Sequence, residues 1–254
     1  MPRTEETVTE IKHWSNKTFS FKTSKNPDFN FRTGEFTMMG MMIDGKRRMR
    51  AYSMASTKHE DHIEWVSIKL DDGPLTSHLQ HISIGDKVLV NDKSSGTLVN
   101  ENLQPGRNLY LISTGTGIAP FLGIIKDLET YEKFEHVILT HTVQYEDELI
   151  YREHLEHLKP AGKFTYFNTL TQQDWPRTGR ITNWIKDDRL WQETGNEQFD
   201  PAQDRMMICG SMALNKDIVD WLNGIGATEG NSKEQGTYVV EKAFVGGLLH
   251  IKNL

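Results

Sequence analysis

The chain has 254 residues, a net charge of −6 and one cysteine, and its length suits one large domain or two modest ones. One cysteine excludes an internal disulfide and an iron–sulfur cluster, which needs about four thiolates, so redox chemistry would require an organic cofactor. The negative net charge argues against nucleic acid as the main partner. No apolar run reaches the length of a membrane span, so we expect no membrane partner. The first residues are polar and lack the apolar core of a secretory signal, so we expect a cytoplasmic protein.

The first hundred residues are rich in short, partly alternating segments of aromatic and β-branched residues, which predict strands. The predicted strands are 19–23, 36–43, 49–56, 63–70 and 86–92, and a short helix is expected within 75–82. Closely spaced strands without intervening helices are typical of an antiparallel barrel or sandwich.

The pattern changes near residues 103–108, after which strands alternate with helices. The predicted strands are 109–113, 136–143, 163–170, 205–210 and 237–244, and the predicted helices are 119–131, 147–158, 181–191 and 213–226. This alternation predicts a parallel sheet with helices on both faces. We expect one domain over residues 1–104 and a Rossmann-like domain over residues 105–254.

The segment "STGTGIAPF" joins the first strand of the second half to its first helix. Glycines let the backbone approach a ligand closely, free N–H groups at the helix start favour an anion, and Pro120 suits a first helical turn. Thr114, Gly115, Thr116 and Gly117 are therefore candidates for binding a pyrophosphate, at the position where dinucleotides usually bind. A turn that needs its glycines only for tightness is the alternative.

A later strand ends in "MMICGSMAL", where Ser211 is suited to cap the next helix. A lone cysteine such as Cys209 is most often a small buried hydrophobic residue. The alternative is a polarizable thiol at the end of the sheet, beside a bound ring, and such a thiol need not be a nucleophile.

The segments "RAYSMAS", "SIKLDDGPLTSHL", "LYLISTGTGIAPFLGII", "MMICGS" and "YVVEKAFV" occur in order along nearly the whole chain. This ordered set resembles the bacterial-type ferredoxin–NADP(+) reductases. The resemblance implies an antiparallel Greek-key β-barrel that binds FAD, followed by an α/β Rossmann-like domain with a parallel sheet that binds NADP(H). It also implies electron exchange with ferredoxin or flavodoxin.

The resemblance implies that Arg50 neutralises the FAD pyrophosphate, Tyr52 stacks on the isoalloxazine and Ser53 bonds near its N5. These roles agree with the affinity of guanidinium for phosphate, the flat tyrosine ring and the two-way hydrogen bonding of a hydroxyl. An exposed strand arginine and a core tyrosine are the alternative. The other implied flavin-site residues are Ala51, Val66, Ser67, Ile68, Lys69, Gly73, Leu75, Thr76, Ser77, Ala243 and Phe244, and the tail after Val245 would cover the flavin.

The resemblance further implies that the nicotinamide lies beside Cys209 and Tyr52. Glu241 is a candidate carboxylate for handling a proton or orienting a ligand, and a solvated glutamate at a strand end is the alternative. Ala243 belongs to the same implied site.

The chain departs from the family where arginines usually bind the NADP 2′-phosphate. Gln144 and Gln172 occupy two of these positions, Arg180 matches the third, and Arg177 is close enough in sequence to substitute. A neutral amide cannot replace a guanidinium charge against a phosphate. The preference between NADPH and NADH is therefore open, and the family resemblance favours NADPH.

The segment "GKRRMR", residues 45–50, concentrates four cations next to the predicted flavin-binding strand. It is suited to steer an acidic electron carrier, although most such runs are solvated loop faces. We expect an FAD-dependent ferredoxin/flavodoxin–NADP(+) reductase, an oxidoreductase. The alternatives are an NADH-dependent flavin or oxygenase-component reductase, and a module that binds a partner or nucleotide without catalysis.

Overall fold

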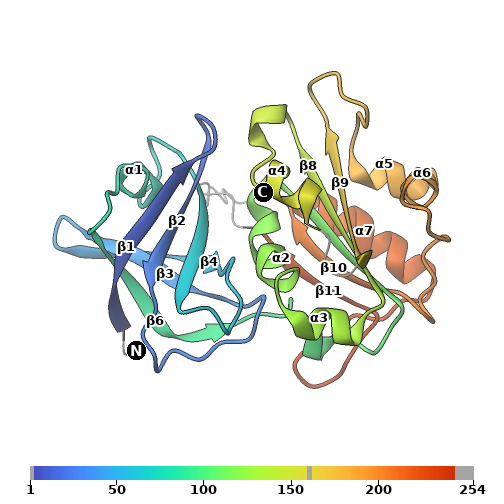
Figure 1. Ribbon diagram of the computed structural model, residues 1–254, viewed down its shortest axis with the longest axis horizontal. Helices are drawn as coiled ribbons and strands as arrows, with labels where there is room; N and C mark the ends of the chain where they lie inside the picture. The colour runs from blue at the N-terminus through green and yellow to red at the C-terminus, as the bar shows by residue number, and fades with distance from the viewer. Residues whose placement is uncertain (1–2, 159–161, 244–254) are drawn as a thin grey trace, which may run out of the picture.

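The computed structural model describes residues 3–158 and 162–243, which form two β-sheets with different architecture (Figure 1). An antiparallel sheet comes first, and its strand order is β4-β3-β6-β1-β2-β5. Its strands are β1 (Arg3–His13), β2 (Thr18–Ser24), β3 (Phe36–Ile43), β4 (Lys46–Ser53), β5 (His62–Ile68) and β6 (Lys87–Ser95), and the short helix α1 (Thr76–Leu79) lies between β5 and β6.

The two end strands of this sheet, β4 and β5, approach each other, so the sheet curls into a barrel. The backbone N–H of Ala55, just after β4, donates to the carbonyl oxygen of Glu64 on β5 at 2.9 Å. Tyr52 on β4 and Ser67 on β5 are joined by a side-chain hydrogen bond of 3.0 Å. Aromatic side chains such as Trp65 and Phe21, which are at most 1% exposed, fill the interior. The predicted Greek-key antiparallel barrel is confirmed.

A tight hairpin connects β3 to β4 and places the basic segment at the edge of the barrel. Ile43 pairs with Lys46, and the two residues between them, Asp44 and Gly45, have positive φ of 50° and 69°. Two residues with positive φ form the type I′ turn that best matches strand twist, for which Asp-Gly is a favoured sequence. The cations of Lys46–Arg48 therefore lie on an exposed end of β4.

The second sheet has five parallel strands in the order β11-β10-β7-β8-β9. They are β7 (Asn108–Thr114), β8 (His136–Val143), β9 (Phe164–Leu170), β10 (Arg205–Gly210) and β11 (Tyr238–Lys242). The connecting helices are α2 (Ala119–Ile124), α3 (Leu128–Lys133), α4 (Arg152–His157), α5 (Ile181–Lys186), α6 (Arg189–Thr194) and α7 (Met212–Gly224), with short 3₁₀ turns at Asn100–Asn102, Gly115–Ile118 and Glu146–Glu148.

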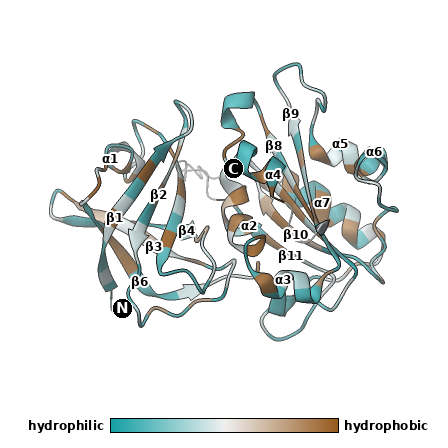
Figure 2. Ribbon diagram, in the orientation of Figure 1, coloured by the Kyte–Doolittle hydropathy of each residue, from teal (hydrophilic) through white to brown (hydrophobic). Residues whose placement is uncertain are grey.

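Alternate side chains of the central strand β7 enter two separate cores, one on each face of the sheet. Leu109 and Leu111 pack with residues of α2 and α4, on the side that faces the barrel. Tyr110 and Ile112 pack with residues of α5, α6 and α7 on the opposite side. Residues coloured as hydrophobic recur along α2 and the parallel strands in Figure 2. Burial on both faces explains the continuous apolar sequences of these strands, and the predicted Rossmann-like domain is confirmed.

Several expected elements differ from the observed ones. β1 was not expected, because its sequence is polar and only Glu6 and Val8 in it are fully buried. The expected helix 119–131 is two helices, since the Asp127 carboxylate caps α3 by accepting the N–H of Glu129 at 3.1 Å. The expected helix 181–191 is likewise divided at Asp188, where φ is 60°. Only residues 152–157 of the expected helix 147–158 are α-helical.

Among the described helices, none combines the length and the hydropathy that a membrane span requires.

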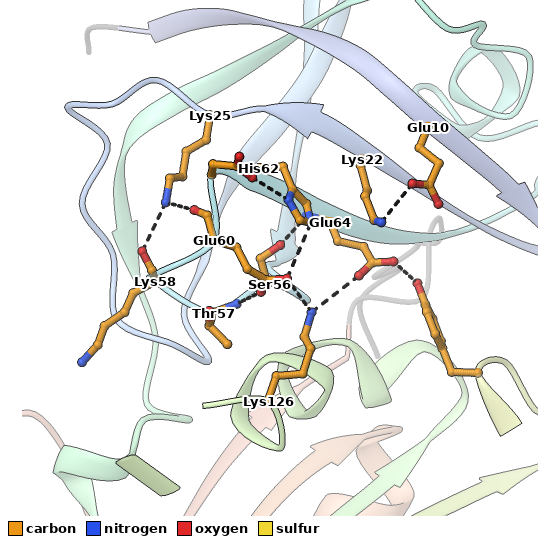
Figure 3. Close-up of polar contacts among 12 residues, drawn as sticks. Glu10, Lys22, Lys25, Ser56, Thr57, Lys58, Glu60, His62, Glu64 and Lys126 are labelled. Carbon is orange, nitrogen blue, oxygen red and sulfur yellow. Dashed lines mark hydrogen bonds and ion pairs between the residues drawn. The ribbon is translucent and has the colours of Figure 1, made fainter. Parts of the chain in front are cut away.

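Polar contacts join the two domains. Figure 3 shows Lys126, from the segment between α2 and α3, reaching to Glu60 and Glu64 of the barrel. Its ammonium lies 3.2 Å from a Glu60 carboxylate oxygen and 3.7 Å from one of Glu64. The Tyr151 hydroxyl, just before α4, donates to the other Glu64 oxygen at 2.5 Å. Glu64 thus accepts from two elements of the α/β domain, and these contacts fix the relative position of the sheets.

Candidate active site

A cavity of about 520 Å³ lies between the barrel and the carboxyl ends of the parallel strands. The barrel contributes Lys17, Thr18 and Ile68 to its lining. The α/β domain contributes the ends of β7, β8, β9 and β10 and the starts of α5 and α7, with Thr114, Gly115, Thr116, Thr142, Val143, Gln144, Glu148, Ile150, Thr171, Gln172, Arg180, Ile181, Thr182, Ser211, Ala213, Leu214 and Asp217. Ligands of doubly wound sheets bind at this edge.

The two glycines of the predicted phosphate loop have different tasks. Gly115 has a φ of 54°, and a Cβ built on it would meet no atom within 4 Å, so its backbone faces open space. A Cβ on Gly117 would lie 2.2 Å from the carbonyl oxygen of Cys209. Gly117 is therefore required for packing against β10, whereas Gly115 lines the cavity together with Thr114 and Thr116. Pro120 lies in the first turn of α2, as predicted.

A buried histidine supports this loop from below. His141, on β8, is fully buried, and its Nε2 lies 2.9 Å from the carbonyl oxygen of Gly115. Burial lowers the pKa of His141 to about 4, so the ring is neutral and its Nε2–H donates to Gly115. The Tyr166 hydroxyl lies 3.4 Å from the other ring nitrogen, Nδ1. The sequence showed His141 in the segment "HTVQ" but gave no sign of this contact.

Tyr52 and Arg50 are two residues apart on β4 and so lie on the same face of the strand. The half-buried Tyr52 ring is held edge-on by Trp65, with 6.4 Å between ring centroids and 90° between planes. Its hydroxyl bonds Ser67, and burial raises its pKa, so it remains a phenol. The exposed guanidinium of Arg50 bonds only the carbonyl oxygen of Met49 and makes no ion pair with any described residue.

This pair of side chains fits a flavin dinucleotide. A fixed aromatic ring with an accessible part suits a flat tricyclic ring, and an uncompensated guanidinium on the same face suits a phosphate. Ser53 and Ala51, which alternate with them on β4, are half-buried. Ile68, at the end of β5, belongs to the wall of the cavity.

Other predicted flavin-site residues are engaged by the protein itself. The Lys69 ammonium donates to the carbonyl oxygen of Ser15 at 2.7 Å. A Cβ on Gly73 would lie 1.9 Å from the Thr76 hydroxyl oxygen, so Gly73 is needed for that close approach. Ser77 is half-buried and its hydroxyl contacts His78 at 3.0 Å. Val66 and Leu75 are core residues. None of these residues lines the cavity, and Ser77 keeps the most accessible hydroxyl among them.

Cys209, which was predicted beside the nicotinamide together with Tyr52, lies near the end of β10, and the candidate carboxylate Glu241 lies near the end of β11. Cys209 is 2% exposed in an apolar core, and burial raises the pKa of its thiol, so it is not a thiolate. The half-buried Glu241 is not a solvated strand end: one of its carboxylate oxygens accepts from the Thr97 backbone N–H, and from the Thr97 hydroxyl at 3.2 Å. Burial raises the Glu241 pKa. Ala243 donates its N–H to Gly210, while Phe244 and the tail after Val245 lie outside the described residues.

The amides and arginines that depart from the family pattern lie at the other end of the cavity. Gln144, Gln172 and Arg180 all line it. Arg177 does not: its Nε donates to Glu193 at 2.9 Å, and its guanidinium lies 4.7 Å from the centroid of the Phe167 ring. Arg180 is thus the cation available at this end, because Arg177 is held elsewhere.

Comparisons with known proteins agree with this geometry. Residues 6–96 match the oxidoreductase FAD-binding domain family, and residues 111–220 match the oxidoreductase NAD-binding domain family. Ferredoxin–NADP reductase A of Sorangium cellulosum is 46% identical over 96% of this chain and 91% of its own length. The ferredoxin–NADP reductase of Azotobacter vinelandii is 42% identical over 94% of this chain and 97% of its own.

A solved ferredoxin NADP+ reductase from Neisseria gonorrhoeae, with bound FAD and NADP, superposes with a TM-score of 0.90 at 28% identity. The match covers 96% of this chain and 100% of that one. The resemblance drawn from the ordered motifs is confirmed by these relatives, and the chain belongs to the ferredoxin–NADP reductase family.

Proposed function

We propose that this protein is an FAD-dependent reductase that exchanges a hydride with NADPH and single electrons with a ferredoxin or flavodoxin. The observation that carries the proposal is the shared cavity, whose walls are the Gly115 loop of one domain and the barrel surface that ends in Ile68. It is supported by two ferredoxin–NADP reductases that are 42% and 46% identical to this chain over nearly its whole length.

FAD, when bound, supplies the ability to accept a hydride and to release electrons one at a time. In this proposal Arg50 binds its pyrophosphate and the Tyr52 ring orients its isoalloxazine, with Ser53 and Ser67 offering hydroxyls to polar edges. The hydrogen bond between Tyr52 and Ser67 fixes the tyrosine ring before any ligand arrives. Such preorganisation lowers the entropy cost of binding.

Thr114, Gly115 and Thr116 would hold the pyrophosphate of NADPH, because their backbone borders the cavity. His141 keeps the Gly115 carbonyl turned inward by its hydrogen bond. The neutral Cys209 thiol would be an apolar neighbour of the nicotinamide rather than a proton donor. Glu241, which is bound to Thr97, would orient the segment between the domains instead of moving a proton.

The segment Lys46–Arg48 is a suitable docking surface for an acidic carrier. All three side chains are exposed, and none forms a salt bridge with another described residue. These unpaired cations lie on β4, the strand that carries Arg50 and Tyr52, and would attract a negatively charged protein despite the chain's net charge of −6. We place the reaction in the cytoplasm.

We also propose that the domain boundary lies at residues 104–105. This position is between β6, which ends at Ser95, and β7, which begins at Asn108.

The test is anaerobic reduction of the purified FAD-loaded protein by NADPH, followed at the flavin absorbance, and then addition of oxidised ferredoxin. We expect the flavin to bleach and then to recover as two ferredoxins are reduced for each NADPH. Bleaching without transfer to ferredoxin or flavodoxin would favour the flavin or oxygenase-component reductase instead. A protein that cannot bind FAD would support the non-catalytic alternative.

A further inference from the structure

The end of the cavity formed by β8, β9 and α5 is built mainly from uncharged donors and acceptors. In the sheet order β10-β7-β8-β9, β7 separates β8 and β9 from β10, which carries Cys209. Gln144 follows β8 and Gln172 follows β9, and the Gln172 N–H donates to the Gln144 carbonyl oxygen at 3.1 Å. The two exposed amides therefore leave the backbone at neighbouring points, and both line the cavity.

The charged side chains that line the cavity balance each other. They are Lys17, Glu148, Arg180 and Asp217. The Lys17 ammonium is paired with the Glu148 carboxylate, which also accepts the Gln144 N–H at 3.1 Å. Arg180 is exposed and makes no ion pair with any residue in 3–158 or 162–243. It faces a cavity that also contains Asp217, a carboxylate of α7.

A 2′-phosphate and a 2′-hydroxyl require different surroundings. A phosphate monoester carries a charge of about −1.5 to −2 at neutral pH and is bound best by several guanidinium donors. This cavity offers one unpaired guanidinium, and Asp217, on the helix α7 that follows β10, adds a negative charge to the same cavity. Glutamine amides both donate and accept, so two adjacent glutamines are well suited to a ribose diol.

We propose that this end of the cavity is a ribose subsite with little discrimination, so that the protein uses NADH as well as NADPH. Gln144 and Gln172 bind the ribose hydroxyls, Arg180 favours the phosphate, and Asp217 offsets part of that preference. The inference rests on the proposed function, since it concerns the nucleotide that reduces the flavin.

Titration calorimetry of the FAD-loaded protein with NADP+ and with NAD+, at low ionic strength, tests it without turnover. We expect the two dissociation constants to agree within about tenfold, because one charged contact is partly offset. NADP+ binding more than about a hundredfold tighter than NAD+ would overturn the inference and leave the proposed function intact. Binding of neither nucleotide would overturn both.

Variants show whether Gln144 and Gln172 determine the ratio of the dissociation constants for NAD+ and NADP+. Q144R and Q172R should each raise the preference for NADP+ by about ten- to a hundredfold, mainly through tighter NADP+ binding. R180Q should abolish the remaining preference. N183R is the matched control, because Asn183 is exposed on α5 but does not line the cavity, and it should leave the ratio unchanged. If Q144R and Q172R fold with unchanged Tm and the ratio stays the same in both, the subsite is elsewhere and the inference fails.

Discussion

His141 is buried and neutral, so its replacement by glutamine should make the stability of the protein less dependent on pH. Its pKa falls from an ordinary 6.5 to about 4 on folding, because burial disfavours the charged ring. Above pH 6.5 neither state binds a proton at this site. As pH falls from 6.5 towards 4, the unfolded chain binds a proton that the folded protein does not, so stability is lost. At 1.36 kcal/mol per pKa unit, this loss reaches about 3 kcal/mol at pH 4.

The assay is urea unfolding of the wild type and of H141Q at pH 7.5, 6.5, 5.5 and 4.5, with constant excess FAD. Glutamine places an amide N–H near the position of Nε2, so the bond to Gly115 is retained. The variant should be less stable than the wild type at pH 7.5, since its fit is poorer. The difference should shrink by about 1.4 kcal/mol for each pH unit between 6.5 and 4. A difference that stays constant over this range would refute a neutral, buried His141.

The KM for NADPH reports whether His141 positions the Gly115 loop, separately from its effect on the stability of the protein. H141L removes the donor to the Gly115 carbonyl, so it should raise the KM for NADPH several-fold with little change in kcat. H141Q, which keeps a donor, should restore most of the KM. Equal KM values in the wild type and both variants would show that this hydrogen bond does not position the loop.

R50A should weaken FAD binding about ten- to a hundredfold by removing a charged contact to phosphate, as measured by quenching of flavin fluorescence; unchanged affinity would exclude Arg50 from the site. G115V should raise the KM for NADPH, because a branched residue is strained at a φ of 54°, and a normal KM would count against the loop. Y151F should lower the free energy of unfolding by about 1–3 kcal/mol, since Glu64 loses a donor. Equal urea midpoints for the wild type and the variant would contradict this contribution. Reversal of the charges in Lys46–Arg48 should reduce kcat/KM for ferredoxin and make it depend less on salt concentration. The reduction of ferricyanide by NADPH is the control and should be unaffected. An unchanged salt dependence would show that these residues do not bind the carrier.

Strands with a strong local signal could be predicted from the sequence to the residue. β3, β8 and β10 have the predicted bounds, because they are rich in apolar residues and are followed by turn or loop residues. β1 could not be predicted, since its eleven residues are mostly polar and its position depends on pairing with both β2 and β6. Tertiary pairing decides the structure of such a segment, and a single sequence does not contain that information locally.

In the candidate site too, features with a local sequence signal could be predicted, whereas features set by tertiary contacts could not. Arg50 and Tyr52 are two residues apart on one strand, so their common face could be predicted from spacing alone. The Gly115 loop was also predictable, because a glycine turn after the first parallel strand has a local signature. The contacts of His141 with Gly115, and of Glu241 with Thr97, join residues far apart in the chain. Neither has a sequence signature, since the partner of each group is set by the register of the sheet and the docking of the domains.

The central claim is that the flavin ring lies between Tyr52 and the cavity bordered by Gly115. A crystal structure of the protein with FAD and NADP+ tests this claim most directly. We predict that the isoalloxazine stacks on the Tyr52 ring, that Arg50 contacts the FAD pyrophosphate, and that the NADP+ pyrophosphate lies against the Gly115 backbone. A flavin bound away from Tyr52, or a nucleotide outside this cavity, would contradict the account.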